Sequence, residues 1–208
     1  WWPGDGPLDV VIGAILTQAA AWTNVEMALA NLKANGCFSL AAIRRTSQED
    51  LGAIIRSSGY FNAKARKLKE FAGHVNRWYQ GDLDRFLSQD LDSLRSELLS
   101  IHGIGPETAD DIVLYAADKP SFVIDSFTRR ILARLGIRDG ALEESYASCQ
   151  ALFHENLPRD AAMFNEFHAL LDRHAKDACA KTPRCAGCCL LDVCATGQTV
   201  GGKQALAG

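Results

Sequence analysis

Several common features are missing from this sequence, and each absence argues against a class of protein. No run of 18 uninterrupted apolar residues occurs, which excludes a transmembrane helix. No segment resembles a secretory signal peptide, and the seven cysteines are an odd number, so a disulfide framework is a poor interpretation. Neither charge dominates, since 22 Lys and Arg stand against 25 Asp and Glu. The overall charge therefore does not indicate a nucleic-acid partner, although a binding face can still be basic locally.

Alternation of apolar and polar residues is also scarce, whereas apolar residues recur at helical spacing along most of the chain. The single strand-like run is 121–124. This pattern predicts an all-α fold. Helices are expected at 10–18, 51–55, from Phe61 onward, and at 92–101, 106–117, 126–135, 143–156 and 160–173.

The two ends of the chain differ from the rest. The first residue is Trp1 rather than methionine, so we expect further residues to precede it in the natural protein. The last stretch, 197–208, is rich in glycine and small residues and is expected to form a flexible tail.

Two local patterns concern a helix end and a helix face. Thr46 followed by Glu49 resembles a capping box for the helix that carries Leu51. The helix after Phe61 is expected to expose a row of basic side chains, either as a solvated face or as a patch that faces phosphates. These side chains are Lys64, Arg66, Lys67 and Lys69.

Four cysteines near the C-terminus follow the spacing C-x5-C-x2-C-x5-C, and a fifth, Cys189, stands beside the third. The four are Cys179, Cys185, Cys188 and Cys194. Four thiolates within sixteen residues form a compact cage of soft ligands, which suits an iron–sulfur cluster or zinc. The spacing alone leaves both metals open.

A glycine-rich turn lies between two of the expected helices. Gly103 and Gly105 flank Ile104 and permit a tight turn, and Pro106 suits the first position of the next helix. Backbone amides at such a turn and helix start can bind an anion, for example a DNA phosphate. A turn of this kind is also commonly only a connection between helices.

Asp125 lies directly before the expected helix 126–135. An aspartate in this position is ordinarily an N-cap. It also lies twenty residues after Gly105. This spacing suggests a catalytic role, which depends on the family that the motifs resemble.

The turn, the aspartate and the cysteine loop together resemble the helix-hairpin-helix DNA glycosylases of the endonuclease III type, in the same order and spacing from Trp1 to Cys194. The resemblance implies two helical lobes with a cleft between them. One lobe would be a six-helix barrel (8–118) and the other an iron–sulfur lobe (1–7 and 119–196). It also implies a [4Fe–4S] cluster on the four spaced cysteines, with Cys189 not a ligand, and double-stranded DNA containing damaged bases as partner. The DNA-contacting residues implied are Gly103, Ile104, Gly105, Thr108, Lys64, Lys181 and Arg184.

The chain departs from endonuclease III at the residue that attacks the sugar. Bifunctional relatives carry a lysine in the hairpin helix, and Glu107 occupies that position here. A carboxylate cannot form an imine, so the resemblance implies a monofunctional reaction in which Asp125 stabilises the positive charge that develops on the sugar. Adenine-mismatch relatives add a catalytic glutamate, whose nearest match here is Gly13. An enzyme without that acid suits bases that already carry positive charge.

The aromatic residues resemble the 3-methyladenine DNA glycosylase III branch of this superfamily. They imply a base pocket formed by Trp1, Trp2, Pro3 and Trp22. Stacking a cationic purine on such rings is favourable by about 1 kcal/mol or more. Trp1 and Trp2 could equally be a frayed end or core filler. Gln18 resembles the wedge that fills the space left by the flipped nucleotide, although Ala19 and Ala20 replace the polar residues that usually follow it.

The sequence therefore predicts a monofunctional base-excision DNA glycosylase for an alkylated purine such as 3-methyladenine. We expect a cytoplasmic monomer with no membrane association. Two alternatives stay open: an endonuclease III-like glycosylase and lyase for oxidised pyrimidines, and a non-catalytic helix-hairpin-helix iron–sulfur protein that binds DNA.

Overall fold

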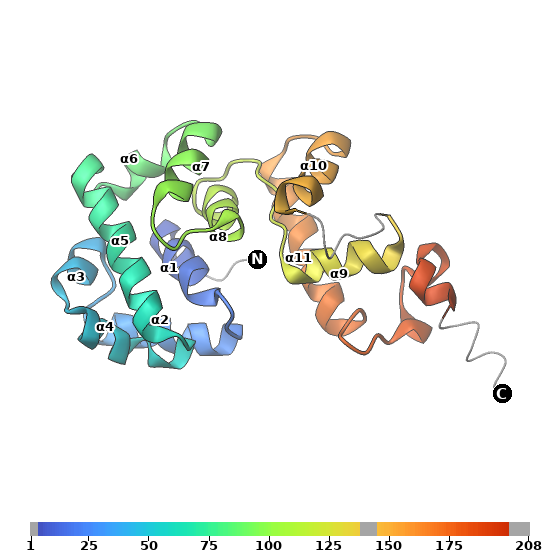
Figure 1. The fold of residues 1–208 in the computed structure, drawn as a ribbon, viewed down its shortest axis with the longest axis horizontal. Coiled ribbons are helices and arrows are strands. Elements are labelled where there is room, and N and C mark those ends of the chain that lie inside the picture. The colour runs from blue at the N-terminus through green and yellow to red at the C-terminus, as the bar shows by residue number, and fades with distance from the viewer. Residues whose placement is uncertain (1–3, 138–144, 200–208) are drawn as a thin grey trace. The chain divides into compact units, whose positions relative to one another are not determined.

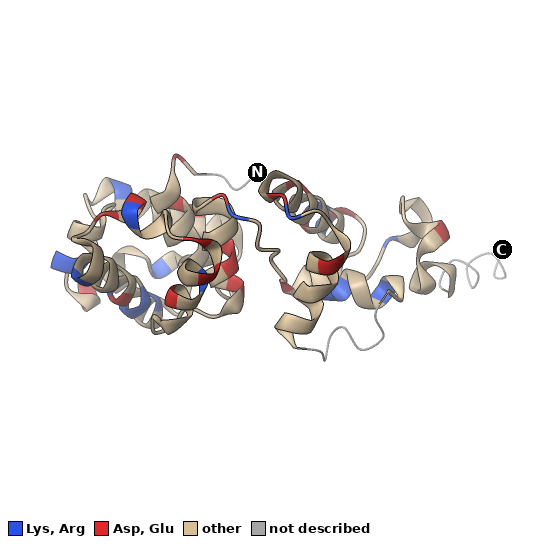
Figure 2. Ribbon diagram, turned by 90° about the horizontal axis from the view of Figure 1, so that it is seen from above, with Lys and Arg blue, Asp and Glu red and all other residues tan. Residues whose placement is uncertain are grey.

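The computed structural model describes residues 4–137 and 145–199, and within these ranges the chain is helical and contains no strand, which confirms the all-α prediction. The chain forms two compact units, with the boundary after Ser121 (Figure 1). No helix in the described part is long and apolar enough to cross a membrane. Residues of both charge signs occur on the helices of the first unit (Figure 2).

The first unit contains most of the helices. Its elements are α1 (Pro7–Thr17), α2 (Trp22–Ala34), α3 (Leu40–Arg45), α4 (Gln48–Ile54), η1 (Arg56–Ser58), α5 (Phe61–Tyr79), α6 (Leu83–Leu87), α7 (Leu91–Ser100), α8 (Pro106–Asp111) and η2 (Ile112–Ala116). One apolar core runs through this unit from Val11 to Val113. The core holds α1 and α5 in fixed positions, and these two helices carry several of the residues discussed below.

Four helices in this unit, α3, α4, α6 and α7, begin where the sequence supplies a capping side chain. The hydroxyl of Ser39 and the carboxylates of Asp82 and Asp90 each accept a backbone N–H of the following turn. The predicted cap of α4 is wrong by one residue: Ser47 accepts the N–H of Asp50, whereas Thr46 ends α3 and donates to the carbonyl of Ala42.

A buried ion pair fixes the hairpin between α7 and α8. Arg95 on α7 donates from Nε and Nη2 to the two carboxylate oxygens of Asp110 on α8, at 2.7 and 3.0 Å. The Asp110 side chain is fully buried, and Ser121 also donates to it. Separating a buried carboxylate from a partner that donates two hydrogen bonds to it costs free energy. The turn between the two helices therefore has a well-defined shape. The predicted helix 106–117 is an α-helix only as far as Asp111 and continues as the π-helical turn η2.

The second unit is smaller. It contains α9 (Ser126–Leu135), α10 (Tyr146–Asn156), α11 (Ala161–Asp177), η3 (Cys185–Gly187) and η4 (Leu191–Val193). Phe122 lies in its centre, stacked on Phe153 at 3.7 Å and edge-on to Phe164 at 5.3 Å between ring centroids. The predicted N-terminal end of α10, 143–144, lies outside the described residues.

The run 121–124, strand-like in sequence, is not a strand. Side chains of α10 bind its backbone instead of a neighbouring strand. Phe122 N–H donates to His154 and its carbonyl accepts from Gln150, while Ile124 N–H donates to the hydroxyl of Tyr146. The apolar residues of this run therefore reflect burial at the start of this unit rather than sheet formation.

Candidate functional site

The glycine turn has the conformation that its sequence requires. Gly103 has a φ of +87°, in the region that favours glycine, and Gly105 precedes the first residue of α8 with Pro106 at the first helical position. The Ile104 side chain is buried, and its N–H donates to the carbonyl of Ile101, so this amide closes the turn. Thr108 is also buried, in the first turns of α8.

Gln18, the predicted wedge, lies at the C-terminal end of α1 and is bound to this turn. Its Nε2 donates to the Gly103 carbonyl at 3.1 Å and to the Thr108 hydroxyl at 2.8 Å. Its Oε1 accepts from the ammonium of Lys67 on α5. The structure thus brings the predicted wedge together with two predicted DNA-binding residues, Gly103 and Thr108, and adds Lys67 to them.

Lys64 does not lie on the exposed face that the sequence predicted. Its side chain is only 2% exposed, and its Nζ donates to the carbonyls of Leu16 at 2.8 Å and Ser58 at 2.6 Å. Burial, together with the nearby positive charge of Lys67, lowers the pKa of Lys64 to about 8. Lys64 therefore joins the end of α1 to the loop before α5, and the DNA-binding role predicted for it has no support.

The predicted base pocket is described only in part. Trp22 is half-buried, begins α2 and packs against the core of the first unit. Trp1, Trp2 and Pro3 lie outside the described residues. Gly13 is buried within α1, where it offers no side chain for acid catalysis.

Asp125 is the N-cap of α9, as its position in the sequence predicts. Its Oδ1 accepts the backbone N–H of Thr128 at 2.7 Å. The second oxygen, Oδ2, lies 3.8 Å from Nε2 of His168 on α11, and the Asp125 side chain is 19% exposed. One carboxylate oxygen thus caps the helix while the other lies beside an imidazole.

The environment of Asp125 keeps its carboxylate ionised. Burial by itself raises the pKa of this group, but His168 and the N–H of Thr128 outweigh burial, so the pKa lies below its ordinary value. At neutral pH the residue is a partly accessible negative charge. Such a group can stabilise a developing positive charge and bind a water molecule.

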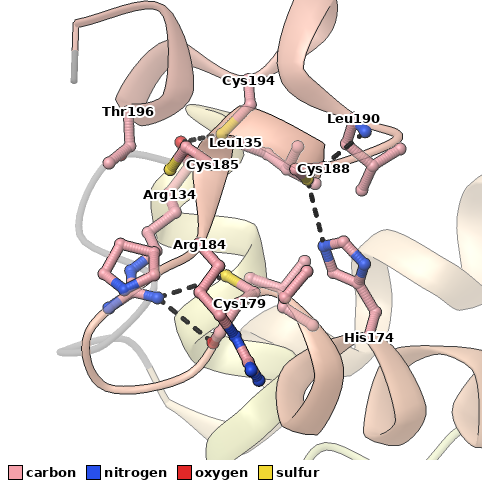
Figure 3. Close-up of a pocket in the computed structure, with 13 residues that line it drawn as sticks. Arg134, Leu135, His174, Cys179, Arg184, Cys185, Cys188, Leu190, Cys194 and Thr196 are labelled. Carbon is pink, nitrogen blue, oxygen red and sulfur yellow. Dashed lines mark hydrogen bonds between the residues drawn. The ribbon is translucent and has the colours of Figure 1, made fainter. Parts of the chain in front are cut away.

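The four spaced cysteines line one cavity in the second unit (Figure 3). Apolar side chains of Ile131, Leu135 and Leu190 also line it. Cys189 is exposed and is not among the lining residues. Within residues 4–137 and 145–199, no three His, Cys, Asp or Glu side chains converge closely enough to hold a single metal ion. The thiols therefore surround a shared space rather than meet at one point.

Hydrogen-bond donors approach the sulfur atoms around this cavity. The N–H of Leu190 lies 3.4 Å from Sγ of Cys188, the N–H of Gly197 lies 3.3 Å from Sγ of Cys194, and Arg134 Nη1 lies 3.3 Å from Sγ of Cys179. N–H donors of this kind stabilise thiolates and tune the clusters that thiolates hold.

Arg134, in the last turn of α9, also holds the backbone of the cysteine loop. Its guanidinium donates to the carbonyls of Cys179, Ala180 and Lys181 at 3.2, 2.6 and 2.9 Å. Lys181 has an exposed side chain, and Arg184 is exposed as well and donates to the carbonyl of Lys176 at 3.0 Å. The two predicted DNA-binding residues of the loop are thus on the surface.

Neither His168 nor Arg134 is predicted from the sequence, and Lys67 is predicted only as a member of the basic row on the helix after Phe61. Lys67 is three residues after Lys64, which puts both on one side of α5, but the spacing gives no sign that Gln18 accepts from it. His168 follows Phe164 at i+4, so helical periodicity could have predicted its burial. Nothing local marks Arg134, since its partners are more than forty residues away.

Comparison with known proteins connects these features. Residues 12–159 match the family model described as HhH-GPD superfamily base excision DNA repair protein. A Methanocaldococcus jannaschii protein named "Putative DNA repair glycosylase" is 39% identical over 93% of this chain and 88% of its own length. The endonuclease III of Sulfolobus acidocaldarius is 29% identical over 88% of this chain and 79% of its own.

Solved structures share the fold. A Helicobacter pylori 3-methyladenine DNA glycosylase bound to 1,N6-ethenoadenine is 27% identical, with a TM-score of 0.75 over 85% of this chain and 87% of that one. A trapped covalent intermediate of endonuclease III with DNA has a TM-score of 0.82 over 96% of this chain and 88% of that one, at 22% identity. The second likeness concerns the fold alone.

Proposed function

The chain belongs to the HhH-GPD superfamily of base excision DNA repair proteins, and from this premise we propose that it is a monofunctional DNA glycosylase. The observation that carries the proposal is Asp125, a partly exposed carboxylate whose pKa lies below its ordinary value. The M. jannaschii relative named "Putative DNA repair glycosylase" supports the same activity.

Asp125 would act on the sugar of the damaged nucleotide. As the bond between the base and C1′ breaks, positive charge develops on the sugar ring, and an ionised carboxylate beside it lowers the energy of that state. A water molecule attacks C1′, and Asp125 orients it or accepts its proton. Glu107 occupies the place of the nucleophilic lysine and cannot form an imine, so the abasic strand is left intact.

The base removed would be an alkylated purine that already carries positive charge, such as 3-methyladenine. Gly13 supplies no acid to protonate a neutral leaving base. Trp22, together with the aromatic residues at the start of the chain, would stack on the cationic ring. The likeness to the H. pylori 3-methyladenine DNA glycosylase, at 27% identity, supports this substrate class.

The partner would be duplex DNA with one damaged base flipped out of the helix, bound by a monomer. Gly103 and Gly105 form the turn that faces a phosphate, and Gln18 fills the space left in the duplex. Lys181 and Arg184 on the cysteine loop add backbone contacts. We retain these residues and withdraw Lys64, because it is buried.

We also propose a [4Fe–4S] cluster in the second unit, held by Cys179, Cys185, Cys188 and Cys194. Thiols that surround a cavity suit a cluster, in which each thiolate binds a different iron, better than a single zinc ion, which needs its ligands at one point. When bound, the cluster would cross-link the loop 179–194 and so stabilise the unit.

Two assays on one DNA preparation test the proposal. Duplex DNA treated with a methylating agent should release free 3-methyladenine, and a gel should show strand breaks only after alkali. Trp22→Ala should weaken release by the roughly 1–3 kcal/mol that stacking of a base contributes. Nicking without alkali, with a borohydride-trapped covalent complex on oxidised-pyrimidine DNA, would instead favour the endonuclease III-like activity that the S. acidocaldarius relative suggests.

A further inference from the structure

Lys67 has no part in the reaction described above, yet its ammonium and its aliphatic stem are both committed to other residues. The ammonium donates to Oε1 of Gln18. The stem lies against Gly103, where a β-carbon would come within 2.4–2.8 Å of Cγ, Cδ and Cε of Lys67. Gly103 thus serves a second purpose beyond its positive φ: the absence of its side chain leaves room for Lys67.

The amide of Gln18 is engaged at both ends. Nε2 donates to Gly103 and Thr108, while Oε1 accepts from Lys67. A glutamine held in this way lies against the hairpin and cannot enter a duplex without giving up these bonds. Among the partners of Gln18 within residues 4–137 and 145–199, Lys67 is the charged one, so its bond is the one that a competing anion can replace.

A second lysine fixes the backbone next to Gln18. Lys64, three residues before Lys67 on α5, donates to the carbonyl of Leu16 near the end of α1. The two ammonium groups are close enough that Lys67 contributes to the lowered pKa of Lys64. Lys64 is buried and cannot reach DNA, whereas Lys67 is half-buried and can reorient. Lys64 thus fixes the backbone at the end of α1, and Lys67 holds the side chain of Gln18.

We propose that Lys67 is a positioning residue for Gln18: it holds the glutamine against the hairpin in the free protein and releases it by transferring its ammonium to a DNA phosphate at the same turn. The inference rests on the proposed function of this site, in which the hairpin binds DNA backbone and Gln18 enters the duplex. A phosphate brings a full negative charge, whereas the amide oxygen of Gln18 is neutral. The exchange is also favoured because it places an anion near two neighbouring ammonium groups.

A double-mutant cycle in the free protein tests the first half of the proposal. Lys67→Met retains the stem on Gly103 and removes the ammonium, and Gln18→Ala removes its acceptor. Because the two groups bond directly, the destabilisation in urea should be smaller for the double variant than the sum of the single ones. Arg66→Met, which removes a charge from the exposed side of the same helix, should show no coupling with Gln18→Ala.

DNA binding tests the exchange itself. We would measure the affinity for an undamaged duplex and for one carrying a tetrahydrofuran abasic analogue, across a salt series. Lys67→Met should reduce the dependence of log K on log salt by about 0.9, the value for one phosphate contact. It should cost more affinity in the Gln18→Ala background than in the wild type, because the wild type must first break the bond between Lys67 and Gln18.

Each outcome separates this inference from the activity on which it rests. An unchanged salt slope for Lys67→Met, or an equal decrease for Arg66→Met, would overturn the exchange while wild-type binding and excision stand. Zero coupling in binding would show that the bond persists on DNA and would also overturn it. A wild-type protein that binds neither duplex would overturn the proposed function itself.

Discussion

The two units are built from the same kind of element and are stabilised differently. The first has an apolar core that runs from Val11 to Val113 across most of its helices. The second has a small aromatic group around Phe122, and much of its remaining order comes from polar contacts such as those of Arg134 with the cysteine loop. Burial of apolar surface therefore contributes more to the stability of the first unit than to that of the second, whose apolar core is smaller.

This contrast implies that substitutions should have different effects in the two units. A change at a buried residue of the first unit should mainly lower the free energy of unfolding. In the second unit, a change should mainly affect excision or the binding of the cluster. Four predictions test the difference, in order of decreasing effect.

Asp125→Asn should lower the single-turnover excision rate by about a hundredfold or more, because the neutral amide cannot stabilise positive charge on the sugar. Asparagine caps a helix as well as aspartate does, so the fold should be retained. DNA affinity should be unchanged or higher, since a negative charge is removed. The rate is measured as free base released from methylated DNA with enzyme in excess. A variant within tenfold of the wild-type rate would show that Asp125 is only a cap.

Cys179→Ser and Cys194→Ser should lose the cluster and destabilise the second unit while the first unit stays folded. Loops that supply metal ligands fold around the metal, so the defect is in stability before it is in catalysis. Each kcal/mol lost lowers the melting temperature by about 4–8 °C in a unit of this size. Iron content and thermal melting followed by circular dichroism provide the measurement. Cys189→Ser is the matched control and should be nearly silent, and loss of iron in that variant would show that the ligand set is wrong.

Lys64→Met should destabilise the first unit by about 1–3 kcal/mol, because it leaves two carbonyls without their donor. The pKa of Lys64 in the folded protein is about 8, below its ordinary value of 10.5. The unfolded chain therefore binds more protons between these values, so wild-type stability should rise as the pH increases from about 8 to about 10.5. The variant should lack this rise. Urea titrations of both proteins across that range decide the point, and parallel pH profiles would contradict it.

Lys181→Ala should have the smallest effect. Its exposed ammonium would contribute one phosphate contact, so DNA affinity should fall a few-fold and the salt slope by about 0.9. Folding and the rate of excision at saturating enzyme should not change, because the loop is held through the Lys181 carbonyl, which the variant keeps. A loss of excision at saturation would place this residue closer to the reaction than we propose.

Local signals in the sequence predicted the other α-helices but missed α2, α3 and α6. Two further errors have local causes. Thr46 with Glu49 and Ser47 with Asp50 have the same spacing and equivalent chemistry, so the pattern alone cannot choose between the two caps. The apolar residues of 122–124 are buried, as their pattern suggests, but a strand also needs a partner strand. The bonds of that run go to side chains of α10, which no local pattern reveals.

The candidate site was predictable where a motif fixes the backbone and unpredictable where a long side chain crosses between helices. Asp125 and the glycine turn belong to the first kind, since cap and turn chemistry are local. Lys64 belongs to the second kind. Its burial depends on carbonyls supplied by Leu16 and Ser58, which meet only when α1 and the loop before α5 come together.

The helix α9 connects two features that were described separately. Asp125 caps the N-terminus of α9. Arg134, which donates hydrogen bonds to the cysteine loop, lies in the last turn of the same helix. The helix has ten residues, so roughly 15 Å of backbone separates the Asp125 carboxylate from the cysteine loop. A substitution that displaces the cysteine loop would therefore shift α9 and move the Asp125 carboxylate. A substitution of Arg134 would then abolish excision in an activity screen, although the altered side chain contacts neither the sugar nor the base.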